Sequence, residues 1–229
     1  MTDPRAPRSI GVILDGNRRY ARARGLPDAV GHRLGFEKAT KILEWAGEAG
    51  LEHVCFYAFS TENWGRSQDE LAHLMDLYEE FCETWGNTIG TRGGRVRFIG
   101  ELERFRPSLQ EKMRAVEART AGNTKQTAWI ALSYGGRAEV LAAVNALLAE
   151  KATGPVDEAT LRAHMWSAEM PDPDLIIRTG GDLRLSNFLT WQSTYSELFF
   201  LTETLPELSK ARFMNVLEEF GERARRHGK

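Results

Sequence analysis

Short apolar segments rich in β-branched and aromatic residues alternate along the chain with longer amphipathic segments. Six apolar segments have the length of strands, and we expect strands at 9–14, 53–59, 95–99, 127–132, 174–178 and 196–201. Six further segments have the period of helices, at 33–49, 68–88, 107–120, 137–151, 157–166 and 209–226. This alternation predicts an α/β fold with a six-stranded, mostly parallel sheet that carries helices on both faces.

The predicted helix from about residue 68 has a start signal and an apolar stripe. Ser67 can cap its first turn, and Glu70 can return the bond as a capping box. The apolar stripe consists of Leu71, Leu74, Met75, Tyr78 and Phe81. Such a stripe would suit one wall of an elongated apolar cavity, although periodicity alone favours an ordinary helix that faces the core.

Length and composition are those of an ordinary globular chain. The 229 residues fit a single domain, 1–229, with 42% hydrophobic and 27% charged residues. The net charge of -2 argues against a general surface for polyanions, so we expect no nucleic-acid partner and only a local anion site. Cys55 and Cys82 lie in periodic segments and read as buried free thiols. No signal core or spanning segment stands out, which predicts a cytoplasmic protein.

Polar side chains gather directly after four of the predicted strands, in segments 15–19, 60–66, 133–137 and 178–186. The carboxyl ends of parallel strands share one edge of a sheet, where ligands bind, so we expect these segments to meet. Segments 15–19, 60–66 and 178–186 carry four arginines that lie just beyond strand ends, namely Arg19, Arg66, Arg178 and Arg184. Converging guanidinium groups beside glycine-rich turns with free amides indicate a site for phosphate oxygens.

The segment after the first strand combines an acid with cations. Asp15 ends the strand, Gly16 turns the chain, and Arg18 and Arg19 follow. This arrangement can hold a metal ion and an anionic ligand together, or it can be an ordinary loop with solvated charges. His32 opens the next predicted helix and is a candidate phosphate donor, although a lone histidine is more often structural.

The segment after the fifth strand places two arginines around a turn. Glycines at 180 and 181 would let Arg178 and Arg184 face one anion. Ser186 can add a hydroxyl bond and begin a helix that holds Asn187 and Trp191. Alternatively, Arg178 pairs with Asp182 and simply fastens the loop.

Several familiar sites are excluded by spacing. The chain has no histidine, cysteine and carboxylate set at zinc spacing, no P-loop, no dinucleotide-binding glycine fingerprint and no nucleophile elbow. Transition metals, nucleoside triphosphates and dinucleotides are therefore less favoured as ligands, and serine hydrolysis is less favoured as the reaction.

Taken together, the motifs resemble those of the cis-prenyltransferases, the family of undecaprenyl diphosphate synthase and the short-chain (Z)-prenyl diphosphate synthases. The resemblance runs from Ile10 to Gly228. It is carried by DGNRR at 15–19, GH at 31–32, YAFSTENW at 57–64 with Arg66, YGGR at 134–137, DPDLIIRTGG at 172–181, RLSNF at 184–188 and SEL at 196–198.

The resemblance implies a homodimer whose sheet and helices enclose a hydrophobic tunnel. It implies Mg²⁺-dependent condensation of an allylic diphosphate with isopentenyl diphosphate to form a cis double bond. A transient contact with a membrane surface would accompany product release. At the C-terminus, Arg226 and Gly228 resemble a motif that completes the neighbouring subunit's site.

The resemblance also assigns roles to single residues. Asp15 would bind Mg²⁺, Asn63 would assist loss of the isopentenyl proton, and Glu197 would be a second metal-related carboxylate. Substrate would be bound by Gly16, Asn17, Arg18, Arg19, Tyr20, His32, Ser60, Thr61, Glu62, Trp64, Arg66, Arg178, Arg184, Leu185 and Ser186. Because asparagine is a poor base, a water or a diphosphate oxygen would take the proton.

The chain departs from the family pattern at several positions. Arg18 stands where most relatives have glycine, and Tyr20 where tryptophan is usual. Asp28 occupies a position where an arginine commonly contacts diphosphate, which puts that contact in doubt. Ala58 is small where some short-chain enzymes have a large side chain, which favours a long product.

We therefore expect a cis-prenyltransferase that makes a long-chain polyprenyl diphosphate. The alternatives are a short-chain or irregular (Z)-prenyl diphosphate synthase, a non-catalytic lipid-binding partner subunit, and a sugar-phosphate transferase. The last of these explains the arginine loops but not the apolar stripe at 71–81.

Overall fold

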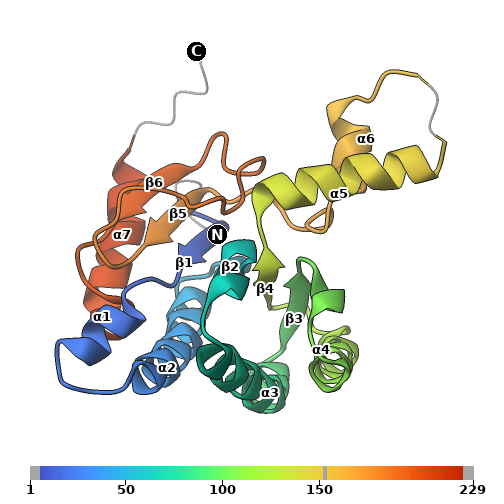
Figure 1. Cartoon of the computed structure of the whole chain (residues 1–229). Helices are drawn as coiled ribbons and strands as arrows, with labels where there is room; N and C mark the ends of the chain where they lie inside the picture. Colours follow the sequence, from blue (N-terminus) through green and yellow to red (C-terminus); the bar gives the residue numbers. More distant parts are fainter. Residues whose placement is uncertain (1–5, 152–153, 224–229) are drawn as a thin grey trace.

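The computed structural model describes residues 6–151 and 154–223, with Trp85 described by its backbone alone. In these residues six strands form one sheet in the order β3-β4-β2-β1-β5-β6, and every neighbouring pair is parallel. The strands are β1 (Ser9–Ile13), β2 (His53–Ser60), β3 (Gly94–Ile99), β4 (Gln126–Tyr134), β5 (Leu175–Arg178) and β6 (Glu197–Phe200). The predicted α/β class and strand positions are confirmed, and the sheet is wholly parallel (Figure 1).

The predicted helices are also present, with shifted ends. They are α2 (Asp28–Glu48), α3 (Gln68–Thr91), α4 (Pro107–Thr120), α5 (Gly136–Ala149), α6 (Glu158–Ala163) and α7 (Lys210–Glu222). Short 3-10 turns add η1 (Thr61–Gly65), η2 (Leu102–Arg104) and η3 (Leu205–Glu207). α1 (Asn17–Arg22) was not predicted, and α2 begins earlier than predicted, at Asp28 directly after Pro27. His32 therefore lies one turn inside α2, which corrects its expected place at the helix start.

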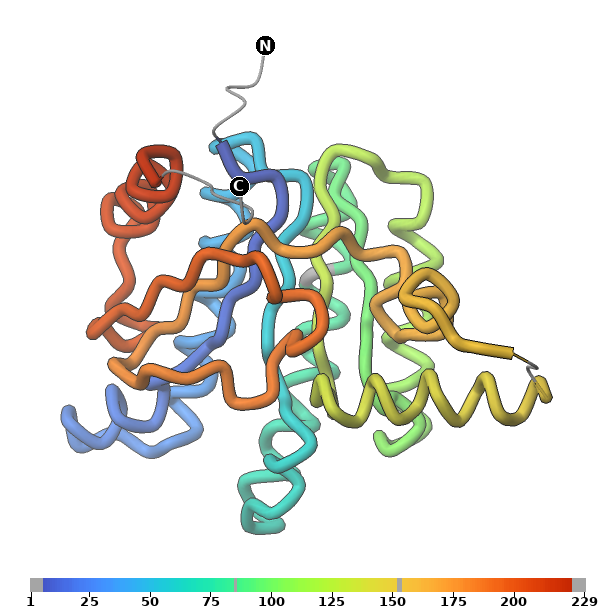
Figure 2. The backbone as a smooth tube through the Cα atoms, turned by 90° about the horizontal axis from the view of Figure 1, so that it is seen from above, coloured from blue at the N-terminus to red at the C-terminus, as the bar shows by residue number. Residues whose placement is uncertain are grey.

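The two faces of the sheet are covered differently. One face packs on α2, α3, α4 and α7 through a large apolar core that includes Val12, Phe56 and Ile130. The opposite face packs on Met170, Phe188 and other side chains of an irregular segment instead of long helices. Figure 2 shows this segment, about residues 165–200, crossing over the strands. The expectation of helices on both faces is thus met on one face only.

The segment after β5 contains turns where a helix from Ser186 was predicted. Ser186, Asn187 and Leu189 have positive φ angles of 50°, 66° and 44°. This left-handed backbone interrupts the right-handed helical path, so the predicted helix cannot form. The turns bring Phe188 and Leu189 down onto the sheet, where both are fully buried.

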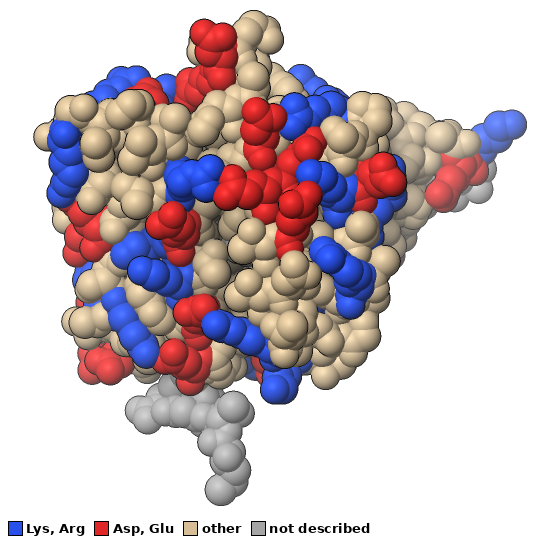
Figure 3. All heavy atoms as spheres, turned by 90° about the horizontal axis from the view of Figure 1, so that it is seen from below, with Lys and Arg blue, Asp and Glu red and all other residues tan. Residues whose placement is uncertain are grey.

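Other sequence predictions concern thiols and membranes. Cys55 and Cys82 are buried and free, as predicted. Burial raises the pKa of the Cys82 thiol to about 12, so this group stays protonated. Among the described helices none is long and apolar enough to span a bilayer. On the face in Figure 3, acidic and basic side chains are intermingled around a central hollow.

Candidate functional site

The carboxyl edge of the sheet carries a cavity of about 560 Å³ that has a polar side and an apolar side. Its polar lining consists of Asp15, Asn17, His32, Ser60, Glu62, Asn63, Arg66, Arg178, Ser186 and Asn187. Three of the four predicted loops therefore meet here. The fourth, 133–137, lies behind the lining, where the Arg137 N–H donates to Asn187 Oδ1.

A smaller hollow of about 160 Å³ adjoins this cavity and shares some of its lining. Gly16, Arg18, Arg19 and Arg22 line the hollow in addition to Asp15 and His32. Cations at the mouth and a carboxylate at its centre give this edge the chemistry expected of a diphosphate site.

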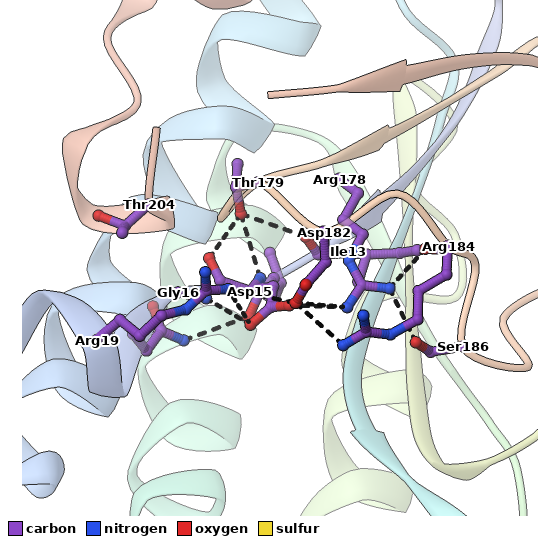
Figure 4. A network of polar contacts seen from close by, with 12 residues as sticks. Ile13, Asp15, Gly16, Arg19, Arg178, Thr179, Asp182, Arg184, Ser186 and Thr204 are labelled. Carbon is purple, nitrogen blue, oxygen red and sulfur yellow. Dashed lines mark hydrogen bonds and ion pairs between the residues drawn. The ribbon is translucent and has the colours of Figure 1, made fainter. Parts of the chain in front are cut away.

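Asp15 is held at the mouth by three groups. Its Oδ1 accepts from the Gly16 N–H at 2.6 Å, and its Oδ2 accepts from Arg178 Nη2 at 2.8 Å. Arg19 Nη2 lies 3.5 Å from Oδ1 (Figure 4). Partial burial alone would raise the pKa of Asp15, but the bonds from Arg178 and Gly16 outweigh it and hold the pKa below its usual range. The carboxylate is therefore ionised at neutral pH.

Gly16 is required by the turn that presents Asp15. Its φ is +97°, and a Cβ there would meet the Thr204 Cα at 2.9 Å. The backbone of α2 at Gly35 likewise lies close to α1, since a Cβ at Gly35 would be 2.5 Å from Asn17 Oδ1. Glycine at these positions lets α1 deliver its arginines beside His32.

Arg178 is nearly buried and connects two loops to Asp15. Besides its bond to Asp15, its Nη1 donates to the Arg184 carbonyl and to Ser186 Oγ, the latter at 2.8 Å. Asp182 Oδ2 lies 3.6 Å from Arg178 Nη2 and 3.0 Å from Arg184 Nη2. Arg178 and Arg184 thus both face the Asp182 carboxylate. The Arg178–Asp182 pair, which the sequence offered as an alternative that fastens the loop, is therefore present.

The two glycines of this loop turn as predicted, but their amides are occupied. Gly180 and Gly181 have φ angles of 88° and 83°. The Gly180 N–H donates to the Glu203 carbonyl and the Gly181 N–H to the Leu201 carbonyl. The expectation of free amides at this turn is wrong, so side chains must supply most of the contacts to an anion.

Glu70 gathers the remaining basic side chains of the mouth. Its carboxylate lies 2.8 Å from Arg66 Nη1, 3.2 Å from His32 Nε2 and 3.7 Å from Arg18 Nη1. Ser67 Oγ accepts from the Glu70 N–H, but the Glu70 side chain turns to these basic groups, so only half of the predicted capping box forms. Burial lowers the pKa of His32 although the Glu70 bond opposes this, and the ring is neutral at neutral pH.

Asn63 is fixed by the turn that contains it. Its Oδ1 accepts from the Ser60 N–H at 3.1 Å, and the Ser60 side chain returns a bond to the Asn63 N–H. The carbonyl oxygen of the amide is therefore committed to the backbone, and the amide nitrogen is the group left for a ligand. Two other buried atoms at the site, Asn17 Oδ1 and Arg178 Nε, have no partner within the described chain. Unpaired polar atoms of this kind fit a polar ligand.

The inner part of the cavity is apolar. Its lining there includes Leu14, Phe36, Ala58, Leu74 and Tyr78. Tyr78 is almost fully buried, and its hydroxyl donates to the Ala58 carbonyl at 2.9 Å. One continuous cavity thus joins a charged mouth to a hydrocarbon-like interior.

Several predicted substrate residues do not line either hollow. Trp64 packs against Phe59 and Phe105, and its Nε1 donates to Ser133 Oγ at 2.9 Å. The other such residues are Tyr20, Thr61, Arg184 and Leu185. Tyr20 carries Arg24 over its ring at 3.8 Å, and Leu185 packs on the core.

Glu197 lies at the opposite edge of the sheet from Asp15. It begins β6 level with Leu175, whereas Asp15 follows the far end of β1. Its Oε2 accepts from Arg223 at 2.7 Å. Within one chain the two carboxylates cannot share a metal ion, because Glu197 is level with Ile10 and the five residues from there to Asp15 span roughly 16 Å. The 226–228 motif lies outside the described residues.

A magnesium ion fits Asp15 by donor chemistry. Mg²⁺ is commonly held by one or two protein carboxylates, with waters and substrate phosphates as the other ligands. Asp15 offers an ionised, partly exposed carboxylate, and Asp182 is a second carboxylate near Arg178 and Arg19. From the sequence alone, Asp182 was predicted only as a loop partner and Glu70 only as a cap, since their convergence with the cations depends on tertiary structure.

Comparison with known proteins identifies the family. Residues 13–228 match the Prenyltransf family model, described as undecaprenyl diphosphate synthase. The chain belongs to this family of prenyltransferases. It is 39% identical to an isoprenyl transferase of Thermotoga maritima over 98% of this chain and 97% of the relative. It is 42% identical to the ditrans,polycis-undecaprenyl-diphosphate synthase ((2E,6E)-farnesyl-diphosphate specific) of Xanthomonas axonopodis pv. citri, over 97% and 88%.

Structural comparison agrees. The fold matches the crystal structure of lavandulyl diphosphate synthase from Lavandula x intermedia in complex with dimethylallyl diphosphate, with a TM-score of 0.94 and 29% identity. The match covers 99% of this chain and all of that one. The resemblance drawn from the motifs is thereby confirmed, and the chain is a prenyltransferase of isoprenoid biosynthesis.

Proposed function

We propose that this prenyltransferase condenses isopentenyl diphosphate with an allylic diphosphate, dependent on Mg²⁺, and builds a long-chain (Z)-polyprenyl diphosphate. The observation that supports this most is the single cavity that joins Asp15 and the mouth cations to an apolar interior. A diphosphate head and a hydrocarbon tail need these two surroundings side by side.

The site residues divide between the two substrates. Arg18, Arg19 and His32 stand beside Asp15 and would hold the allylic diphosphate. Arg178 and Ser186 would hold the isopentenyl diphosphate, with the Asn63 amide oriented toward the cavity by η1. Mg²⁺, held by Asp15, would supply charge neutralisation of the diphosphate.

The reaction breaks the allylic C–O bond and forms a carbon–carbon bond to the terminal alkene carbon of isopentenyl diphosphate. Bond formation leaves the positive charge on C3, the substituted alkene carbon, and a proton then leaves C2 to a diphosphate oxygen as the new C2=C3 double bond forms. Arginines stabilise the negative charge that develops on the leaving diphosphate. Each methylene of the growing chain that is buried against the apolar wall stabilises the bound product by about 0.8 kcal/mol.

The test is incorporation of labelled isopentenyl diphosphate by the purified chain with geranyl or farnesyl diphosphate and Mg²⁺. We expect label in the butanol-extractable fraction, and its loss on chelation of the metal. Absence of incorporation with every allylic primer would favour the lipid-binding partner subunit. Thermal stabilisation by sugar phosphates but not by prenyl diphosphates would favour the sugar-phosphate transferase.

A short-chain (Z)-prenyl diphosphate synthase is the second candidate. The large Phe36 side chain lines the apolar part of the cavity, and the fold is very similar to that of the lavandulyl diphosphate synthase. Ala58, which is small and lines the cavity, supports the longer product. A dominant product of about fifteen carbons or fewer, three isoprene units, would decide for the short-chain enzyme.

We also propose that the chain acts as a homodimer. A cytoplasmic location and a contact with a membrane surface at product release stay predictions. The proposed dimer is supported by an apolar stripe on α5, which projects from the edge of the sheet (Figure 1). Leu141, Val144 and Leu148 are 63%, 39% and 71% exposed on this helix. Exposed apolar stripes of this kind commonly mark protein interfaces.

A further inference from the structure

Ser133, near the end of β4, has a left-handed backbone although it is not a glycine. Its φ is +46°, and the residue is fully buried. This backbone is unfavourable for a residue with a Cβ, and non-glycine residues that keep it gather at functional sites. The Ser133 carbonyl accepts from the Glu101 N–H at 3.2 Å, which ties β4 to the segment after β3. The contacts of the Ser133 hydroxyl indicate what this conformation serves.

The hydroxyl belongs to a closed network of four side chains, the Trp64 network (Trp64, Ser133, Glu101 and Arg104). Trp64 Nε1 donates to Ser133 Oγ at 2.9 Å, and Ser133 Oγ donates to Glu101 Oε2 at 3.4 Å. A hydroxyl can donate and accept at once, so both bonds form together. Glu101 Oε2 accepts from Arg104 Nη1 at 2.7 Å, and the Arg104 guanidinium lies over the Trp64 ring, 4.9 Å from its centroid. The network therefore joins η1 to β4 and η2.

Trp64 is the residue through which η1 rests on the core. None of the five residues of η1 is buried, and Trp64 is the one that packs against the large apolar core. Its ring meets Phe59 edge-on with centroids 5.0 Å apart, and its centroid lies 5.1 Å from that of Phe105. The orientation of the indole thus decides how the whole turn is seated.

Asn63 and Trp64 follow each other in η1 and project to different sides of it. A 3-10 helix has three residues per turn, so neighbouring side chains point about 120° apart. Asn63 lines the mouth cavity, whereas Trp64 lies outside its lining, under Arg104. Because Asn63 is bonded to Ser60 within the turn, it moves with the turn. A rotation of η1 that displaces the indole therefore also displaces the Asn63 amide.

We propose that Ser133 is a positioning residue for the condensation. With Glu101 and Arg104 it holds the Trp64 indole, and through η1 it sets the direction in which the Asn63 amide meets the isopentenyl diphosphate. This inference rests on the proposed function. Loss of the Ser133 hydroxyl lowers the rate of condensation and spares binding of the allylic diphosphate, because the groups that hold that diphosphate lie outside the Trp64 network.

The test compares kcat and both KM values for the wild type, Ser133→Gly and Ser133→Ala. Glycine adopts a left-handed backbone without strain, so Ser133→Gly removes the hydroxyl and spares the fold. In both variants kcat should fall about tenfold, and the KM of the allylic diphosphate should stay within about twofold. The matched control is Ser108→Ala, which removes a serine–glutamate bond to Glu79, remote from η1, and should keep the wild-type kcat.

A double-mutant cycle tests whether Ser133 acts through Trp64. Trp64→Phe keeps an aromatic ring against Phe59 and removes the indole N–H, so alone it should lower kcat to a similar extent. Combined with Ser133→Gly, it should lower kcat no further than the worse single variant, since both changes break the same bond. The indole N–H resonance of Trp64 in NMR spectra, assigned by its loss in Trp64→Phe, should move upfield in Ser133→Gly.

Two results would overturn this inference. One is a wild-type kcat in folded Ser133→Gly, and the other is fully additive losses of kcat in the cycle. Circular dichroism and thermal melting establish that each variant is folded, and Trp64→Phe tests the same bond without any change at position 133. Absence of turnover in the wild type would instead contradict the proposed function.

Discussion

The cations at the mouth of the cavity are already paired with carboxylates of the chain itself. Arg178 contacts Asp15, Arg19 lies between Asp15 and Asp182, and Arg66 contacts Glu70. A diphosphate that binds here exchanges partners with these carboxylates and does not meet free guanidinium groups. Binding free energy is then the difference between two sets of ion pairs, which makes each carboxylate a determinant of affinity.

Asp15→Asn should lower kcat for isopentenyl diphosphate incorporation by about 10²–10³-fold, the loss typical when one charge-stabilising group is removed. The amide keeps the shape of the side chain and can still accept from Arg178, so folding should survive. Asp76→Asn, which changes an exposed partner of Arg106, is the control and should retain activity. Near-normal turnover of folded Asp15→Asn would remove Asp15 from the proposed role.

Glu70→Gln should tighten the binding of inorganic pyrophosphate by up to about fivefold, because up to about 1 kcal/mol of competing ion pairing is lost. The measurement is the inhibition constant of pyrophosphate at low and high salt, and the gain should shrink with salt. Glu80→Gln, which removes an exposed partner of Arg33 on the same helix, should leave the constant unchanged. Weaker binding by Glu70→Gln would show that Glu70 mainly positions the cations.

Elements were easier to predict from the sequence than contacts between them. The strands and the long amphipathic helices could be predicted because their periodicity is local. The approach of the Asp15 and Arg178 loops could be predicted because the carboxyl ends of parallel strands share one edge of the sheet. Glu197 was assigned from a motif, and only the register of β6 shows how far it lies from Asp15. The turns from Ser186 to Leu189 were misjudged because tertiary packing of Phe188 overrides helix-like spacing.

Gly16→Ala should destabilise the fold by about 1–3 kcal/mol, because a non-glycine residue must adopt the left-handed backbone and its Cβ clashes with Thr204. Urea unfolding measures the change. Gly25→Ala provides the comparison, since Gly25 also has a positive φ but has no atom within 4 Å of the added Cβ. Equal losses for the two variants would mean that the clash contributes nothing.

The contact between α3 and α4 should depend on pH through Glu79. Ser108, Arg106 and Lys112 hold the pKa of this carboxylate down, to about 2. Since the folded pKa lies below the ordinary value of 4.5, the stabilisation is present above pH 4.5 and is lost as the pH falls toward about 2. Glu79→Gln should flatten the dependence of Tm on acid pH, whereas Glu83→Gln should leave it nearly intact.

At the scale of the whole molecule, the exposed apolar stripe on α5 is a surface suited to binding a partner. α5 and α6 pack on each other through Ala143, Leu147 and Leu161, at a distance from the main core. The outward side of α5 is left with large apolar residues. A second copy would cover the stripe by two-fold symmetry, with the same surface on both chains.

Leu148→Lys should weaken this assembly, because it places a charge in the apolar contact. Light scattering after size exclusion should report a dimer for the wild type and a shift toward monomer for the variant. Leu183→Lys changes another highly exposed leucine, outside α5, and serves as the control. A wild-type chain that is monomeric at all concentrations would end the proposal of a dimer.

The position of β1 in the middle of the sheet has a consequence for synthesis on the ribosome. One edge of β1 is paired early, when β2 emerges, but its other edge waits for β5, with Ile10 opposite Leu175. Until about three-quarters of the polypeptide has been translated, a hydrophobic strand edge stays unsatisfied and open to wrong partners. Nascent chains halted before Leu175 should therefore depend on chaperones much more than chains halted after Arg178.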